Sequence, residues 1–345
     1  MTWVEPHYSR EQVRRAGRTF VDPGSSPVER ELARAIINNW RSAHGFPLNS
    51  VQVVLRNKVR RESSGDPVVA QRTKRLPSIR RKLERFAKMD LSRMHDIGGC
   101  RAVLEDIDEV RAVEASYLSN RSRSKNLIAR HDDYLSNPKP DGYRGIHVVV
   151  NYQGGGAQRV WSGLRVEVQL RTKMQHAWAT ALETVDIFTR QALKSNAGDP
   201  EWMRFFALMS AEVAHREGQP IVPETPATAA ERRSELRALA RQLRVAERLE
   251  AYGKTVRVLE ETSVRKEDRH FLLVLDVDHG RLSVRAFPNA AAAEEAYGAL
   301  EGEVGANFDV VLVAVSSMTA LRRAYPNYFL DTTSFVELVK NALAY

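Results

Sequence analysis

One short segment alternates apolar and polar residues as a half-buried β-strand does, and its polar members could hold a metal-bound phosphate. Glu167, Gln169 and Arg171 would lie on one face of this strand, and valines and a leucine on the other. A carboxylate, an amide and a guanidinium in one row suit a metal–polyphosphate ligand. The alternative is an ordinary solvent-exposed strand face.

A second carboxylate, Asp96, lies just ahead of a glycine-rich entry into an apolar strand at Cys100–Leu104. Gly98 and Gly99 would let the backbone approach a ligand closely. Asp96 is therefore a candidate second ligand for Mg²⁺, which typically takes one or two carboxylates together with phosphate oxygens and waters. The alternative is a helix-to-strand turn capped by this aspartate.

A sharply turned loop with Asn-Pro and Asp-Gly pairs leads into a predicted strand, Gly145–Tyr152. Tyr143 and His147 would share one face of that strand, with a glycine between them. This arrangement leaves a shelf on which a nucleobase could stack, for about 1–3 kcal/mol. Lys139 and Arg144 lie close enough in sequence to meet phosphates. The alternative is a core tyrosine in a β-hairpin.

The fourth feature is a basic run from Arg72 to Lys82 that opens an amphipathic helix, with Ile79 and Leu83 on the apolar side. Several cations would point one way, with arginines offering two-pronged phosphate contacts and lysines point charges. Charge runs of this kind are also typical of solvated faces and nucleic-acid patches.

Together the four features resemble the synthetase domain of RelA/SpoT alarmone enzymes, over roughly residues 30–215. Each motif is moderately specific, and all four in this order are highly specific. The matching residues are Arg72, Lys74, Ser78, Lys82, Asp96, Gly99, Arg101, Asp133, Tyr134, Pro138, Lys139, Gly142, Tyr143, Arg144, Ile146, His147, the run 166–172 and the run 175–179.

The resemblance implies a nucleotidyltransferase-like fold, a mixed β-sheet flanked by helices. It also implies that Asp96 and Glu167 hold Mg²⁺ on ATP, while an acceptor 3′-hydroxyl attacks the β-phosphate and AMP leaves. The general base stays open, and Glu167 is a candidate. The further roles implied are ATP binding by Arg72, Lys74, Ser78, Lys82 and Arg101, acceptor binding by Lys139, Tyr143, Arg144 and His147, and support of the metal site by Gln169 and Arg171.

Departures from the family pattern leave the acceptor open. The stretch 130–133 begins like the family's basic form and ends like its acidic form, Gly145 replaces a common serine, and Thr184 stands where many relatives carry histidine. The leading hypothesis is (p)ppGpp synthesis from ATP and GDP or GTP. The first alternative is the same chemistry on a tRNA 3′ end or an adenosine nucleotide, as in toxin-type synthetases. A second alternative is an inactive RNA-binding or regulatory module.

Bulk composition agrees with these partners without choosing among them. The chain has 345 residues, a net charge of +9 from 52 basic and 43 acidic residues, and a sequence pI near 9.7. Such a basic excess favours polyanionic partners. The single cysteine, Cys100, excludes an intrachain disulfide and a cysteine-based zinc cluster. We expect a cytoplasmic protein without a membrane span, which could form a homo-oligomer or bind an antitoxin.

The chain is expected to divide at a Pro- and Thr-rich stretch. Residues 1–218 would form the synthetase domain with N-terminal helices, 219–229 a linker, and 230–345 a small α+β domain of regulatory or structural role. The roughly 70 residues before the basic run are too few for an alarmone hydrolase domain.

The expected elements include one helical pattern from Pro27 to about Arg61, a loop at 62–71, and helices near 173–193 and 201–216. The C-terminal part would contain a charged helix near 230–252, strands near 270–278, 281–287 and 308–316, a helix at 289–303, and one or two terminal helices. Its core would hold Phe271, Leu273, Leu275, Val310, Leu312 and Val313.

Overall fold

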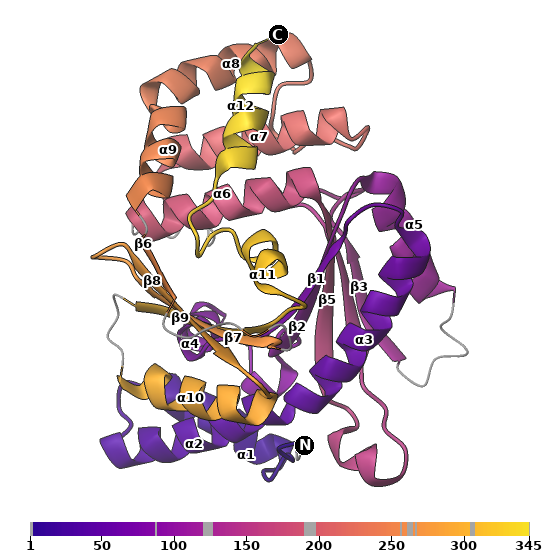
Figure 1. Ribbon diagram of the computed structural model, residues 1–345, viewed down its shortest axis with the longest axis vertical. Coiled ribbons are helices and arrows are strands. Elements are labelled where there is room, and N and C mark those ends of the chain that lie inside the picture. Colours follow the sequence, from indigo (N-terminus) through magenta and orange to yellow (C-terminus); the bar gives the residue numbers. More distant parts are fainter. Residues whose placement is uncertain are drawn as a thin grey trace.

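A mixed β-sheet with helices on both faces forms the centre of the protein (Figure 1). The computed structural model describes residues 3–86, 88–119, 127–189, 198–255, 257–260, 265, 268–303 and 308–344. Nine strands are described, and in sheet order they are β3 (Leu127–Asp133), β4 (Ile146–Asn151), β5 (Arg165–Thr172), β2 (Gly98–Leu104), β1 (Val68–Thr73), β9 (Phe308–Ala314), β7 (His270–Asp276), β8 (Arg281–Phe287) and β6 (Arg257–Glu260). The expected mixed sheet flanked by helices is confirmed.

Twelve α-helices and two short 3₁₀ turns are described around this sheet. The helices are α1 (Arg10–Val21), α2 (Pro27–Ala43), α3 (Gly45–Glu62), α4 (Leu76–Arg85), α5 (Ile107–Leu118), α6 (Lys173–Thr189), α7 (Pro200–Arg216), α8 (Ala229–Gln242), α9 (Val245–Thr255), α10 (Ala290–Glu303), α11 (Met318–Ala324) and α12 (Thr333–Leu343), and the turns are η1 (Leu91–Arg93) and η2 (Gly156–Trp161). None of these helices is long and apolar enough to cross a membrane.

The N-terminal elements differ from the sequence-based expectation. Ser9 and Ser26 each begin a helix through a capping box, which satisfies backbone N–H groups of the first turn. The pattern predicted as one helix from Pro27 is two helices that meet at His44. The loop predicted at 62–71 is also wrong in its second half, because β1 begins at Val68.

Strand β1 was missed because its stabilising contacts are distant in sequence. Its residues pair with β2 on one side and with β9 on the other, so its partners lie about 30 and 240 residues away along the chain. A six-residue strand next to a polar loop carries little local signal of its own.

The two faces of the central strands have different partners. Even-numbered residues of β2, β4 and β5, such as Ala102, Val148 and Val168, pack under helices α3 and α5. Odd-numbered residues, including Glu167, therefore face the other side, where α6 and α11 lie (Figure 1). In the parallel pairing of β2 with β5, Glu167 lies opposite Gly99, and Arg72 of β1 lies opposite the same glycine.

The C-terminal strands continue the same sheet. Strand β9 pairs with β1, with Val313 opposite Arg72 and Ala314 opposite Gln71, and β7 and β8 follow outward. The residues predicted to fill a C-terminal core are buried, but Phe271 packs in one cluster with Val68 of β1. The division into residues 1–218 and 230–345 stays a prediction, and any such C-terminal unit shares its sheet and part of its core with the N-terminal part of the chain.

Helices from both parts of the chain form a second layer above the sheet (Figure 1). Helices α8, α9 and α12 pack on α6 and α7 around a shared apolar cluster that includes Trp178, Trp202 and Phe335. Within this layer, the Arg232 Nε of α8 donates to the Glu212 Oε1 of α7 at 2.9 Å, and both side chains are 1% exposed. Breaking one side of a buried pair of this kind is expected to be strongly destabilising.

Candidate active site

The first cluster of the site joins one carboxylate to two lysines. Asp96 precedes β2, Lys74 follows β1, and Lys82 lies on α4, so the β1–β2 pairing and the turn into α4 bring the three together. Lys74 Nζ donates to Asp96 Oδ2 at 2.8 Å, and Lys82 Nζ donates to Asp96 Oδ1 at 2.9 Å. These are charge-assisted hydrogen bonds, which are shorter and stronger than neutral ones.

The electrostatics of this cluster keep Asp96 ionised. Burial alone would raise the pKa of Asp96, but the charges and hydrogen bonds of Lys74 and Lys82 outweigh it and hold this pKa far below its usual range. Burial lowers the pKa of Lys74, and the Asp96 carboxylate opposes that effect. The cluster therefore carries two cations around one anion, and an arriving polyphosphate would meet a net positive charge.

A chain of hydrogen bonds runs from Glu167 along the neighbouring strands. His147 Nδ1 donates to Glu167 Oε1 at 3.0 Å, and His147 Nε2 bonds the Tyr143 hydroxyl at 2.5 Å. Arg171 Nη2 donates to the same hydroxyl at 2.8 Å. Gln169 Nε2 donates to the second carboxylate oxygen of Glu167 at 2.7 Å. The pairing of β4 with β5, with His147 opposite Gln169, sets these distances.

Neighbouring charges also shift the pKa values along this chain. Burial opposes ionisation of Tyr143, but Arg171 and His147 outweigh it and lower the pKa of Tyr143 to about 7. Burial lowers the pKa of His147, but Tyr143 and Glu167 raise it to about 9 overall. Burial raises the pKa of Glu167, but the contacts of Glu167 with His147 and Gln169 outweigh burial and hold this pKa well below its usual range. Glu167 is thus a second ionised carboxylate on the same side of the sheet.

Two aromatic rings and one lysine lie beside this chain. Lys139 Nζ is 4.0 Å from the ring centroid of Tyr134 and 4.9 Å from that of Tyr143. The rings of Tyr134 and Tyr143 meet edge to face, with centroids 5.8 Å apart. A cation next to aromatic faces offers both stacking and phosphate contacts. Tyr134 belonged to the matched motif but had no predicted role, and its position beside Tyr143 is what distinguishes it.

Two glycines shape the space around the carboxylates. A Cβ at Gly99 would meet only the Glu167 carbonyl oxygen, at 3.9 Å, so the sheet surface beside Glu167 is open. A Cβ at Gly145 would come within 3.3 Å of Arg171 Cγ, and Gly145 has a φ of +140°. The shelf predicted at Gly145 is therefore occupied by the Arg171 side chain, and glycine replaces the family's serine where both space and backbone conformation favour it.

Two arginines predicted to bind ATP lie under the C-terminal segment 318–330. Arg101 Nη1 donates to the Ala324 carbonyl at 3.4 Å, and its guanidinium lies 5.9 Å from the Tyr325 ring centroid. The β1 residues that flank Arg72 on the same face pack in one cluster with Tyr325 and Tyr328. Burial, together with the charges of Arg171 and Arg72, lowers the pKa of Arg101 to about 10. The part of this face around Arg101 is thus covered, while the surface at Gly99 stays open.

Surface and core contacts fasten this covering segment. Arg323 pairs with Asp66 in the loop before β1. The Arg323 carbonyl lies 3.1 Å from His176 Nε2 of α6. Tyr325 and Tyr328 are 3% and 1% exposed. This aromatic stretch packs on the C-terminal strands, in one cluster with Phe271 and Val311. The sequence gives no sign of its contact with Arg101, because the two lie more than 220 positions apart.

The structure separates one predicted residue, Arg144, from the cluster. Arg144 is 3% exposed and donates to the backbone carbonyls of Leu135 and Pro220, at 3.0 and 2.9 Å. It holds the loop together and is not brought to the other acceptor residues. Ser78 lies half-buried in the first turn of α4, one turn ahead of Lys82.

The donor set fits Mg²⁺. Among the described residues no three His, Cys, Asp or Glu side chains gather into a metal cluster. Two ionised carboxylates, Asp96 and Glu167, flank the open surface at Gly99, and Mg²⁺ sites of this type are completed by substrate phosphates and waters. The residues present therefore suit a metal that arrives with a nucleotide.

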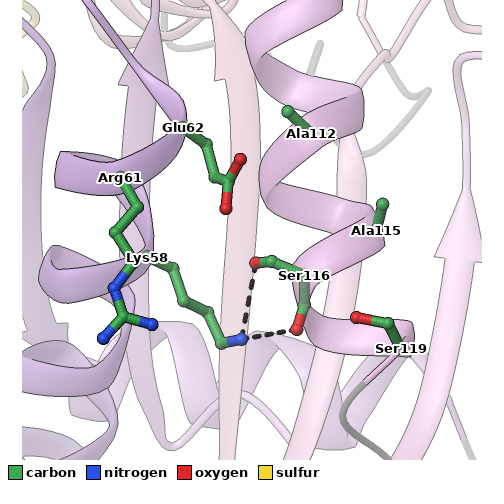
Figure 2. Close-up of a pocket in the computed structure, with 7 residues that line it drawn as sticks. All are labelled: Lys58, Arg61, Glu62, Ala112, Ala115, Ser116 and Ser119. Carbon is green, nitrogen blue, oxygen red and sulfur yellow. Dashed lines mark hydrogen bonds between the residues drawn. The ribbon is translucent and has the colours of Figure 1, made fainter.

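A surface hollow of about 370 Å³ lies elsewhere, between α3 and α5 (Figure 2). Lys58 Nζ in this hollow donates to the Ser116 carbonyl at 2.5 Å, so its charge is already engaged. No residue of the predicted site lines it.

Comparison with known proteins agrees with the sequence motifs. A family model described as "Region found in RelA / SpoT proteins" matches residues 71–186. A GTP pyrophosphokinase of Haemophilus influenzae is 30% identical over 116 residues, which are 34% of this chain and 14% of that protein. GTP pyrophosphokinase YwaC of Bacillus subtilis is 28% identical over 145 residues, which are 40% of this chain and 60% of that protein.

Among solved structures, the chain is similar to small alarmone synthetase 1 of Bacillus subtilis bound to its product pppGpp. It is 25% identical, with a TM-score of 0.39, and the match covers 49% of this chain and 86% of that one. The chain spans only 13–15% of the length of the first curated relatives that it matches.

Proposed function

Because the chain contains a RelA/SpoT synthetase domain, homologous to GTP pyrophosphokinases and small alarmone synthetases, we propose that it transfers pyrophosphate from ATP to the 3′-hydroxyl of GDP or GTP. The observation that carries the proposal is the pair of ionised carboxylates, Asp96 and Glu167, on either side of the open sheet surface at Gly99. Lysines beside one and a histidine–tyrosine chain beside the other give the site a donor side and an acceptor side.

On the donor side, Lys74 and Lys82 would bind the ATP phosphates, and Arg72 and Arg101 would add charge from the sheet. Asp96 and Glu167 would hold Mg²⁺, which would neutralise phosphate charge when bound. Most of the rate enhancement in such transfers comes from positioning and charge stabilisation.

On the acceptor side, the guanine ring of the acceptor would stack against Tyr143 or Tyr134, and Lys139 would contact the acceptor phosphates. The 3′-oxygen forms a bond to the β-phosphorus, the bond from that phosphorus to the bridging oxygen of AMP breaks, and AMP leaves with that oxygen. The hydroxyl proton passes to a base, for which Glu167 is a candidate because its pKa leaves it ionised.

A second acceptor, an RNA 3′ end, has one specific observation in its favour. The outer side of α4 carries exposed Arg80, Arg81 and Arg85. A basic surface continuous with the helix that bears Lys82 would suit a phosphate backbone. ATP binding alone also calls for cations, so the acceptor must be determined directly.

We also infer a regulatory role for the C-terminal segment 318–330. It covers the face of the sheet that carries Arg72 and Arg101, the two arginines predicted to bind ATP. In this arrangement ATP and the segment would compete for the same surface. A partner or ligand that draws the segment away would raise activity, as expected when two states differ in access to one site.

The acceptor is tested by incubating the full chain with γ-labelled ATP, Mg²⁺ and GDP, GTP, ADP or tRNA in turn. We expect labelled product with GDP or GTP, and separation of products identifies the acceptor. Label on tRNA or ADP alone would overturn the guanosine assignment and retain the chemistry. Absence of label with every acceptor, also in the Tyr325→Ala variant described below, would overturn the function.

A further inference from the structure

We infer that helix α10 and strand β9 complete the predicted ATP side of the site, with Arg41, Tyr297 and Asp309 as positioning residues that fix the backbone around Lys74. This inference rests on the proposed function for its meaning, but its contacts are visible without any nucleotide. It assigns the C-terminal part of the chain a supporting role in addition to the covering role of segment 318–330.

The first contact is made by a buried arginine of α2. Arg41 is 5% exposed, and its Nε donates to the Lys74 backbone carbonyl at 2.9 Å. On its other side, the Lys74 amide donates to the Ile97 carbonyl at 2.8 Å, next to Asp96. The Lys74 backbone is thus held from two directions, and the Lys74 side chain reaches Asp96 from a fixed starting point.

The second contact reaches Arg41 from α10. Arg41 Nη2 donates to the Tyr297 hydroxyl at 2.9 Å, and its guanidinium lies 5.1 Å from the Tyr297 ring centroid. Tyr297 is 5% exposed. A buried guanidinium needs partners for its N–H groups, so losing this hydroxyl would remove one of the contacts that fix the position of Arg41. The Tyr297 hydroxyl therefore acts on Lys74 through Arg41.

The third contact lies on the following residue. Arg75 forms an ion pair with Asp309 at the start of β9. Strand β9 also pairs with β1 just ahead of this stretch, placing Val313 opposite Arg72. The segment from Arg72 to Arg75 is therefore framed by β2 on one side and by C-terminal residues on the other. A donor site displaced by about 1 Å can lose about 100-fold in rate, so such framing matters for catalysis.

The two C-terminal contacts with the ATP side would act in opposite directions. The segment around Tyr325 would exclude ATP, whereas Tyr297 and Asp309 would shape the site that ATP enters. Removal of the whole C-terminal part would then unmask the site and loosen it at the same time. A variant that removes only the Tyr297 hydroxyl separates these two effects.

The test compares Tyr297→Phe with Tyr117→Phe in the full chain. Tyr117 is a matched control, because it is 7% exposed and its hydroxyl has no hydrogen-bond partner among the described residues. Without nucleotide, Tyr297→Phe should speed amide exchange in the stretch 72–76 and leave α5 unchanged. With a non-hydrolysable ATP analogue, its Kd should rise about two- to tenfold, the range for one lost hydrogen bond. Tyr117→Phe should change neither.

A double-mutant cycle with Arg41→Lys sharpens the test. If Tyr297 acts through Arg41, the double variant should bind the analogue no more weakly than Arg41→Lys alone. Unchanged exchange at 72–76, or faster exchange spread evenly over β7, β9 and α10, would overturn the inference in favour of plain packing. If the Tyr325→Ala variant binds no ATP, that result would instead count against the proposed function. The comparison of amide exchange at 72–76 between Tyr297→Phe and Tyr117→Phe would still decide the positioning role.

Discussion

The donor side and the acceptor side of the site are built in different ways. The acceptor side, with Tyr134, Lys139, Tyr143, His147 and Glu167, comes from one continuous stretch of 34 residues folded around the β4–β5 pairing. The donor side gathers Lys74, Lys82 and Asp96 and then receives contacts from Arg41 and from four C-terminal residues, Tyr297, Asp309, Tyr325 and Tyr328.

This difference teaches where control can act. Residues of β9 and of the segment 318–330 reach Arg72, Arg75 and Arg101 directly, whereas Tyr143 only borders the apolar cluster to which α8, α9 and α12 contribute. A change in the C-terminal part should therefore alter the use of ATP before it alters the use of acceptor. The predictions below test this asymmetry, from the largest expected effect to the smallest.

The two carboxylates should both be indispensable. Asp96→Asn and Glu167→Gln each keep the side-chain shape and remove the charge that would hold Mg²⁺. We expect turnover to fall roughly 100-fold or more, the scale seen when one electrostatic group of an active site is removed. Melting temperature should confirm that the variants stay folded. Near-normal turnover with an unchanged Mg²⁺ requirement would refute the metal assignment.

The acceptor side should respond to its tyrosine without affecting ATP. Tyr143→Ala should weaken acceptor use by about 1–3 kcal/mol, the stacking range, with ATP binding nearly unchanged. The Tyr143 hydroxyl bonds both Arg171 and His147, so Tyr143→Phe should weaken acceptor use by about 0.5–1.5 kcal/mol. Steady-state KM values for each substrate separate the two sides. Equal losses for ATP and acceptor would make the residue structural.

The donor side should respond to its cover. Tyr325→Ala should raise basal turnover or lower the KM for ATP by roughly tenfold, with the KM for acceptor unchanged, because it favours the open state. Phe335→Ala is the matched control, since Phe335 of α12 is buried like Tyr325 but packs on α6 and α7. Both should lower stability by about 3–5 kcal/mol. Equal activation by both variants would mean that general loosening, and not the cover, is responsible.

Support of the donor side by α10 should depend on pH. Burial raises the pKa of Glu294 to about 7, although Ser42 and Arg41 on α2 oppose this shift. The folded state therefore binds a proton that the unfolded state has already lost, and stability from this group falls as pH rises from about 4.5 to 7. Glu294→Gln should flatten that decline and stabilise the protein by about 1–3 kcal/mol at pH 8. Urea unfolding between pH 5 and 8 measures this, and identical pH dependence in both proteins would refute it.

How much could be predicted from the sequence follows the same division. The strand face of the acceptor side was predictable, because its residues alternate along two adjacent strands and the Glu167–Gln169–Arg171 row lies on one face as expected. The position of Arg144 and the Arg171 side chain beside Gly145 were not. The donor cations were found from their spacing. The hydrogen bond from Arg41 to the Lys74 carbonyl and the packing of segment 318–330 over Arg101 were not. Those contacts join residues 33 and more than 220 positions apart, and periodicity carries no information at that range.

The products formed from ATP test the proposed pyrophosphate transfer most directly. The full chain, or its Tyr325→Ala variant, is incubated with Mg²⁺, acceptor and ATP labelled on the γ-phosphate, and nucleotides are separated over time. The β- and γ-phosphates should move together, so AMP should appear in equal amount to labelled product, without ADP. Release of ADP with label on the acceptor, or labelled phosphate without AMP, would contradict the account.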